Sequence, residues 1–257
     1  MEKLLEAEHF LGRLLSSEGL RFQFELNAFL SASRGVTFVL QKAMSTVPGF
    51  ASWYGRQQAQ MKSDASMAFF VSLRNVSQKE GPIAIVAASG PHGEWSYRFV
   101  GSETPVPKGL EGQDVRICCA AHLAKLAGLL LECDRTFPFH SCPARAFSEE
   151  GKSALGYSWR DVEMAIGLPP GWTAATRIPT VEKLRILRRE IEPLDTTSIR
   201  RISEGDLRAD GARLTLPASS GTGLADDLAT RMGHSNAAAQ HPREVFVRAV
   251  LESVDRE

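Results

Sequence analysis

Hydrophobic residues recur three or four positions apart through the first part of the chain, which is the spacing of one face of an α-helix. Between residues 2 and 16 this pattern predicts an amphipathic helix that ends before Gly19. Between residues 21 and 44 the apolar positions continue for several turns, and small residues such as Ala28 and Ser31 lie among them. We therefore expect a long central helix that neighbouring helices approach closely.

Two further helices are expected after a turn at the Val-Pro-Gly sequence of residues 47–49. Their apolar residues recur at helical spacing over residues 50–61 and 65–78. Asp64 stands directly before the second of these segments and is its expected N-cap. The four segments together predict a helical bundle over residues 1–82.

The pattern changes after Pro82. Residues 83–89 and 95–101 are rich in β-branched and aromatic residues and flank a turn that contains Gly and Pro, which predicts a β-hairpin. Asp114 is then the expected N-cap of a fifth long helix that runs to about Phe137.

The signals weaken beyond residue 138. Short helices are expected over residues 158–166, 181–191 and 242–254. The small, polar segment of residues 217–242 is expected to be flexible.

The pattern as a whole predicts a mainly α protein with a small β-hairpin, in which an antiparallel helical bundle is followed by a less regular α+β C-terminal region. We expect three regions: the bundle (1–82), the hairpin and the fifth helix packed on that bundle (83–140), and the irregular region with short helices (141–257).

The composition is that of a folded globular protein, since 43% of the 257 residues are hydrophobic and 30 basic residues balance 30 acidic ones. A dedicated nucleic-acid binder usually carries a basic excess, which is absent here. No apolar run approaches the roughly 20 residues that span a bilayer, and the N-terminus lacks the features of a signal peptide. We therefore expect a cytoplasmic protein with no membrane association.

The four cysteines do not have the paired spacing of a zinc site, and we expect Cys119 and Cys133 to be small buried hydrophobes. Cys118 and His122 lie one helical turn apart, a spacing at which one helix can chelate a soft metal. Because no second pair stands at ligand spacing, a buried core pair is favoured over a metal site. We expect no metal and no other cofactor.

Three segments carry a family resemblance. A long helix reads LNAFLSASRGVTFVLQ, a short segment reads PGFASWYGRQQAQMKSD, and a later helix reads FFVSLRNVSQKEGP. Over residues 20–82 they resemble the HEPN superfamily of helical bundles, and the triplet Leu73, Arg74 and Asn75 is the most specific part of the resemblance.

Ribonucleases of that superfamily carry an Arg, a polar residue and, after four to six intervening positions, a His on the last helix. The Arg holds a phosphate, and the neutral His takes the proton of a ribose 2′-hydroxyl. Arg74 and Asn75 match the first two positions, but the motif's histidine is missing. Lys79 occupies the position, four intervening residues after Arg74, at which the closest-spaced form of the motif has its histidine. The motif is therefore degenerate, because an exposed lysine is protonated at neutral pH and is a poor base.

Three interpretations of this motif stay open. In the first, Arg74 and Lys79 hold a phosphate of RNA or of a nucleotide without cutting it. In the second, Arg74 and Asn75 are structural and tie the helix end to a neighbouring helix or a partner subunit. In the third, Arg74, Asn75 and Lys79 form the site of a metal-independent endoribonuclease.

The leading functional prediction is a non-catalytic HEPN-like protein that binds RNA, a nucleotide or a protein partner, in the toxin–antitoxin or defence setting that the resemblance implies. The alternatives are the endoribonuclease and a structural scaffold. A homodimer is expected because an isolated bundle of about 80 residues would leave several aromatic side chains exposed; these are Trp53, Tyr54, Phe69 and Phe70.

Overall fold

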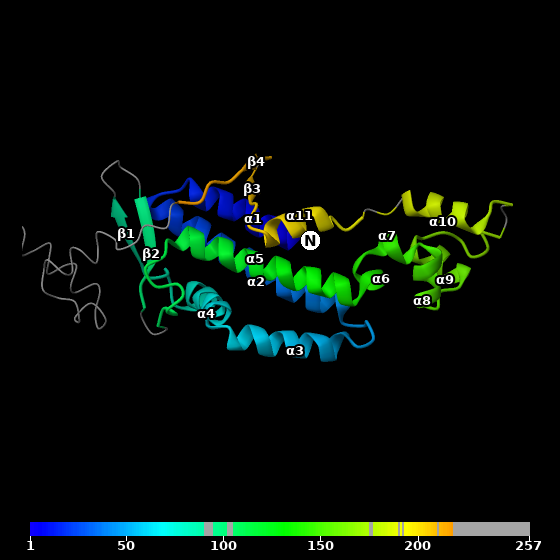
Figure 1. The fold of residues 1–257 in the computed structure, drawn as a ribbon, viewed down its shortest axis with the longest axis horizontal. Coiled ribbons are helices and arrows are strands. Elements are labelled where there is room, and N and C mark those ends of the chain that lie inside the picture. Colours follow the sequence, from blue (N-terminus) through cyan, green and yellow to red (C-terminus); the bar gives the residue numbers. More distant parts are fainter. Residues whose placement is uncertain are drawn as a thin grey trace, which may run out of the picture.

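The computed structural model describes residues 1–89, 95–101, 105–174, 177–189, 191, 193–209 and 211–217 (Figure 1). In chain order its elements are α1 (Glu2–Leu15), α2 (Gly19–Met44), α3 (Phe50–Ser63), α4 (Ala65–Lys79), β1 (Ile85–Ser89), β2 (Trp95–Phe99), α5 (Val115–Thr136), α6 (Pro138–Ser141), α7 (Pro143–Ala146), α8 (Glu149–Ala154), α9 (Trp159–Ala165), α10 (Thr180–Arg189), α11 (Thr196–Ser203), β3 (Arg208–Ala209) and β4 (Ala212–Arg213).

The core of the molecule is a helical bundle built along α2 and α5. Figure 1 shows these two long helices side by side, with α1 and α11 on one side and α3 and α4 on the other. The β1–β2 hairpin lies at one end of the bundle, and the short helices α6 to α10 extend from the other end. Segments α8 to α10 pack around a small apolar cluster of their own, in which Phe147, Val162 and Leu187 are buried.

Helix α5 is buried around most of its circumference. Apolar side chains cover successive faces of it, so that it packs against α1, α2, α4, β2 and α11 at once. Its buried apolar residues are Val115, Cys118, Cys119, Ala120, Leu123, Leu126, Ala127, Leu129 and Cys133.

The hairpin is antiparallel, with Ile85 opposite Phe99. Tyr97 of β2 attaches it to the bundle. The ring of Tyr97 stacks on Phe22 of α2 with 3.6 Å between centroids, and its backbone N–H donates to Oδ2 of Asp114 at 3.0 Å. The predicted caps are both confirmed: Asp64 accepts from the backbone N–H groups of Ser66 and Met67, and Asp114 accepts from that of Arg116.

The last described elements return to the start of the chain. Both carboxylate oxygens of Glu8 on α1 accept hydrogen bonds from the guanidinium of Arg201 on α11, at 2.6 and 2.7 Å. The backbone N–H of Arg208 in β3 donates to the same carboxylate at 2.8 Å. Because Glu8 is only 4% exposed, these bonds compensate the loss of its hydration and fix α11 on the bundle.

The predicted fold class is confirmed: the chain is mainly helical with a small antiparallel hairpin. The short helices expected over residues 158–166 and 181–191 are present as α9 and α10. The flexible segment expected over residues 217–242 and the helix expected over residues 242–254 lie outside the described residues, apart from residue 217 itself. The division into three regions stays a prediction.

The expectation of exposed aromatic residues was wrong. The side chains concerned are between 3% and 5% exposed within a single chain, because α5 and the hairpin cover this face of the bundle; they are Trp53, Tyr54, Phe69 and Phe70. Their burial removes the packing argument for a second subunit, and the homodimer stays a prediction.

Removal of the Arg201 charge should destabilise the fold. In Arg201→Gln the carboxylate of Glu8 stays buried without its ion-pair partner, and we expect the free energy of unfolding to fall by about 3 kcal/mol in urea denaturation. Arg200→Gln removes the same charge from the neighbouring exposed position and should change the free energy of unfolding by less than about 0.5 kcal/mol. Equal effects of the two substitutions would contradict this account of the ion pair.

Candidate functional site

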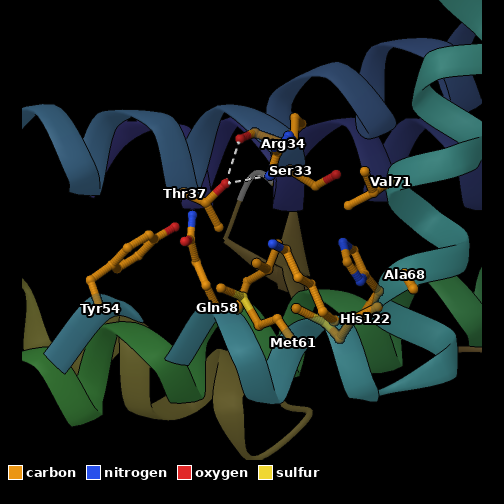
Figure 2. Close-up of a pocket in the computed structure, with 12 residues that line it drawn as sticks. Ser33, Arg34, Thr37, Tyr54, Gln58, Met61, Ala68, Val71 and His122 are labelled. Atoms are coloured by element: carbon orange, nitrogen blue, oxygen red, sulfur yellow. Dashed lines mark hydrogen bonds between the residues drawn. The ribbon is translucent and has the colours of Figure 1, made fainter. Parts of the chain in front are cut away.

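A pocket of about 240 Å³ opens between α2, α3, α4 and α5 (Figure 2). Helix α4 packs against α2, α3 and α5, and all four helices contribute side chains to the pocket. The lining residues are Ser33, Arg34 and Thr37 from α2; Tyr54, Gln58, Met61 and Lys62 from α3; Met67, Ala68 and Val71 from α4; and His122 and Leu126 from α5.

The charged residues of this lining are both cationic. The half-buried guanidinium of Arg34 donates to Oγ1 of Thr37 at 3.1 Å and lies 4.2 Å from the centre of the Phe38 ring. Lys62 is exposed at the end of α3. Within the described part of the chain neither cation pairs with a carboxylate, and no carboxylate lines the pocket. The pocket therefore has a positive potential that an anion would compensate.

The neutral part of the lining combines an apolar wall with a few hydrogen-bonding groups. Met61, Met67, Val71 and Leu126 supply the apolar surface. The hydroxyl of Ser33 donates to the Leu30 carbonyl and that of Thr37 donates to the Arg34 carbonyl, each at 3.1 Å. Because the main chain occupies their protons, these two hydroxyls are not free to act as donors toward a ligand.

Besides the phenol of Tyr54 and the amide of Gln58, the lining carries the imidazole of His122, which is 6% exposed. Its ring stacks on that of Phe70 with centroids 4.1 Å apart and planes 4° apart, and it meets the edge of Phe29. Its Nδ1 is fully buried and has no hydrogen-bond partner. Burial, with a smaller effect of Lys125, lowers the pKa of His122 to about 3, so the imidazole is neutral at physiological pH.

An ion pair fixes the α4 wall of the pocket against α5. The ammonium group of Lys125 donates to Oδ2 of Asp64 and to the Ser66 hydroxyl. Partial burial raises the pKa of Asp64, but the hydrogen bonds from Lys125, Met67 and Ser66 outweigh it and lower the pKa to about 2. Asp64 is therefore ionised when it caps α4, and the cap, the pair and the pocket wall are formed together.

The residues singled out from the sequence lie elsewhere, on the second half of α4. Asn75 and Lys79 are exposed, and Arg74 is half-buried with a fully buried Nε that has no hydrogen-bond partner. None of the three lines the pocket. Their assignment to phosphate binding or to catalysis stays a prediction.

The cysteine predictions are confirmed: Cys119 and Cys133 are buried free thiols in the apolar clusters. Burial raises the pKa of Cys133 to about 11 and that of Cys118 to about 12. Cys118 and His122 are both buried, and among the described residues no third His, Cys, Asp or Glu joins them in a group that could hold a metal ion. The described helices include none that is long and apolar enough to span a membrane.

Comparison with known proteins gives one family match. Residues 16–112, less than half of the chain, match a family model described as bacteriophage lambda protein ea47. Protein ea47 of Escherichia phage lambda is 35% identical to this chain over 63 residues, which are 24% of this chain and 15% of the phage protein. The aligned part is thus a small fraction of that relative. No solved structure matches the chain significantly.

The family match overturns the HEPN resemblance. The region predicted to be HEPN-like, residues 20–82, lies inside the segment that matches the ea47 family model. The features that carried the resemblance, a long helix with small residues and a polar triplet near the end of a later helix, suit many helical bundles, and the histidine that marks the ribonucleases is absent. The toxin–antitoxin setting rested on the same resemblance and is withdrawn with it.

Replacement of His122 should remove a pH dependence of stability. An unfolded imidazole takes up a proton below about pH 6.5, whereas the buried one does not until about pH 3, so the stability that His122 contributes is complete above pH 6.5 and falls as the pH falls toward 3. At about pH 5 we expect the free energy of unfolding of wild type to have fallen by up to about 2 kcal/mol through His122, a loss that His122→Phe does not show; urea denaturation measures it.

The exposed His9 on α1 provides the control. In His9→Gln the free energy of unfolding should differ between about pH 7.5 and pH 5 by the same amount as in wild type. If His122→Phe keeps that difference as well, His122 is not a neutral buried group.

Proposed function

We propose that this protein binds a small anionic molecule with an apolar body, held in the pocket between α2 and α5. The observation that carries the proposal is the unbalanced charge of the lining: Arg34 and Lys62 stand beside an apolar wall with no carboxylate among the lining residues. A ligand that places its anionic group between these cations and its apolar part against Met67, Val71 and Leu126 satisfies both halves of the lining.

Arg34 is the cation that we expect to contribute most. Its contacts with Thr37 and Phe38 hold the guanidinium in place before a ligand arrives, so little side-chain entropy is lost on binding. A fixed guanidinium also gives two parallel hydrogen bonds to a carboxylate or phosphate. Lys62 is exposed and free to move, and its contribution is that of a surface charge.

The lining supports binding rather than catalysis. A hydroxyl nucleophile needs a base within hydrogen-bond reach, yet the hydroxyls of Ser33 and Thr37 donate to helix carbonyls instead. His122 has no hydrogen bond to either of them in the described residues. The proposal is accordingly a non-catalytic binding protein.

The other functional predictions are independent of this proposal. Separate predictions are a nucleotide ligand, RNA, a protein partner, the scaffold role and the endoribonuclease site at Arg74, Asn75 and Lys79. Incubation with labelled single-stranded RNA in the presence of a chelator tests the enzyme. Cleavage that is lost in Arg74→Ala and Lys79→Ala would support it.

The binding proposal is tested with benzoate, phenyl phosphate and the uncharged benzyl alcohol in NMR chemical-shift titrations. We expect the two anions to bind saturably and to shift resonances of α2 to α5. Arg34→Gln should weaken their binding about 10-fold or more, since a charge-assisted hydrogen bond contributes about 1.5–3 kcal/mol. Lys62→Gln should weaken it about 3-fold.

Lys42→Gln is the matched control, because it removes one positive charge from an exposed position of α2 outside the pocket lining. It should leave the affinity within about twofold of wild type. Equal affinity for benzyl alcohol and benzoate, or no effect of Arg34→Gln, would overturn the proposed function.

A further inference from the structure

We infer that His122 determines the specificity of this pocket by donating a hydrogen bond from Nε2 to an acceptor atom on the uncharged part of the ligand. The inference rests on the proposed function, because it concerns the same pocket. It narrows the ligand class to small acids whose apolar body carries an acceptor, as a nitrogen heterocycle does.

The position of the imidazole proton follows from burial. Nδ1 is enclosed and has no partner, so a proton on Nδ1 would be a buried N–H group without an acceptor, at a cost of about 1–3 kcal/mol. Nε2 is not among the fully enclosed nitrogen atoms. The neutral ring therefore carries its proton on Nε2, and the described residues provide no acceptor for it.

The ring is held in a fixed orientation. The parallel stack on Phe70 and the edge contact with Phe29 leave His122 little freedom to rotate. Figure 2 shows the imidazole directed from α5 into the pocket beside Ala68 and Val71. A donor that is already oriented favours ligands with an acceptor at one place.

The charges around His122 indicate where the anionic group and the neutral part of the ligand lie in the pocket. Lys125 and Asp64 neutralise each other beside it, whereas Arg34 and Lys62 remain unpaired in the pocket lining. In Figure 2 Arg34 enters the pocket from α2 and His122 from α5, on opposite walls. The anionic group of the ligand thus belongs on the α2 wall and the neutral acceptor on the α5 wall.

The inference is tested with isosteric probes near neutral pH, where a pyridine nitrogen is an acceptor only. Benzoate is compared with nicotinate and isonicotinate, which place a ring nitrogen at two different positions without a change of shape. We expect wild type to bind at least one pyridine acid about 3- to 10-fold more tightly than benzoate, the range that one neutral hydrogen bond provides.

Two variants separate the hydrogen bond from packing. His122→Phe keeps a ring on Phe70 but has no donor, and it should bind neither pyridine acid more tightly than benzoate, because their ring nitrogen is then buried without a hydrogen bond. His122→Gln places an amide N–H near the position of Nε2 and should restore part of the preference. Circular dichroism and the NMR spectrum of each variant establish that it is folded. If His122→Phe does not fold, the comparison of wild type with His122→Gln tests the inference.

The outcomes distinguish the two proposals. If wild type binds neither pyridine acid more tightly than benzoate, or if the preference persists in His122→Phe, the role of His122 is wrong while the anion pocket stands. If none of the three acids binds, the proposed function fails and the role of His122 fails with it.

Discussion

Helix α5 presents apolar side chains to α1, α2, α4 and α11 at once, and its stable position is therefore at the centre of the bundle. This burial brings a histidine into the interior together with the apolar residues beside it. Because His122 lies between Phe70 and Phe29, its charged form loses hydration without gaining a partner, and the neutral form persists. The neutral, polar character of the α5 wall of the pocket is thus a consequence of how α5 packs.

The most deeply buried carboxylates of the described residues are compensated. Glu8 meets Arg201, Glu25 meets Arg13, and Asp114 meets Arg116. Each pair joins separate segments or fixes a helix start, so these groups have a structural role. Arg34 and Lys62 have no carboxylate partner among the described residues, and unlike these ion pairs they line a pocket with an apolar wall.

The helices of the bundle could be predicted from local signals. Apolar periodicity and the aspartate caps are properties of neighbouring residues, and Asp64 and Asp114 mark the starts of α4 and α5 as expected. The burial of Trp53 and Phe69 could not be predicted this way, because it depends on α5 and the hairpin, which follow later in the chain.

The pocket was missed for the same reason. Arg34, Lys62 and His122 come from three helices, and no spacing in the sequence connects them. The triplet at Leu73, Arg74 and Asn75 was conspicuous because its residues are adjacent. Adjacency in the sequence is a poor guide to a site formed between helices, where each helix contributes one or two side chains.

The match to the ea47 family model divides the pocket into two parts. Residues 16–112 include α2 and α3, and hence both Arg34 and Lys62, whereas α5 with His122 lies beyond the matched segment. The two cations thus lie inside the segment that is similar to the ea47 family, and His122 lies outside it. Long-range charge attracts anionic ligands broadly, whereas a single fixed hydrogen bond discriminates between them. A relative that keeps the two cations but has another residue at the His122 position would therefore still attract acids. It would select acids with a different apolar body.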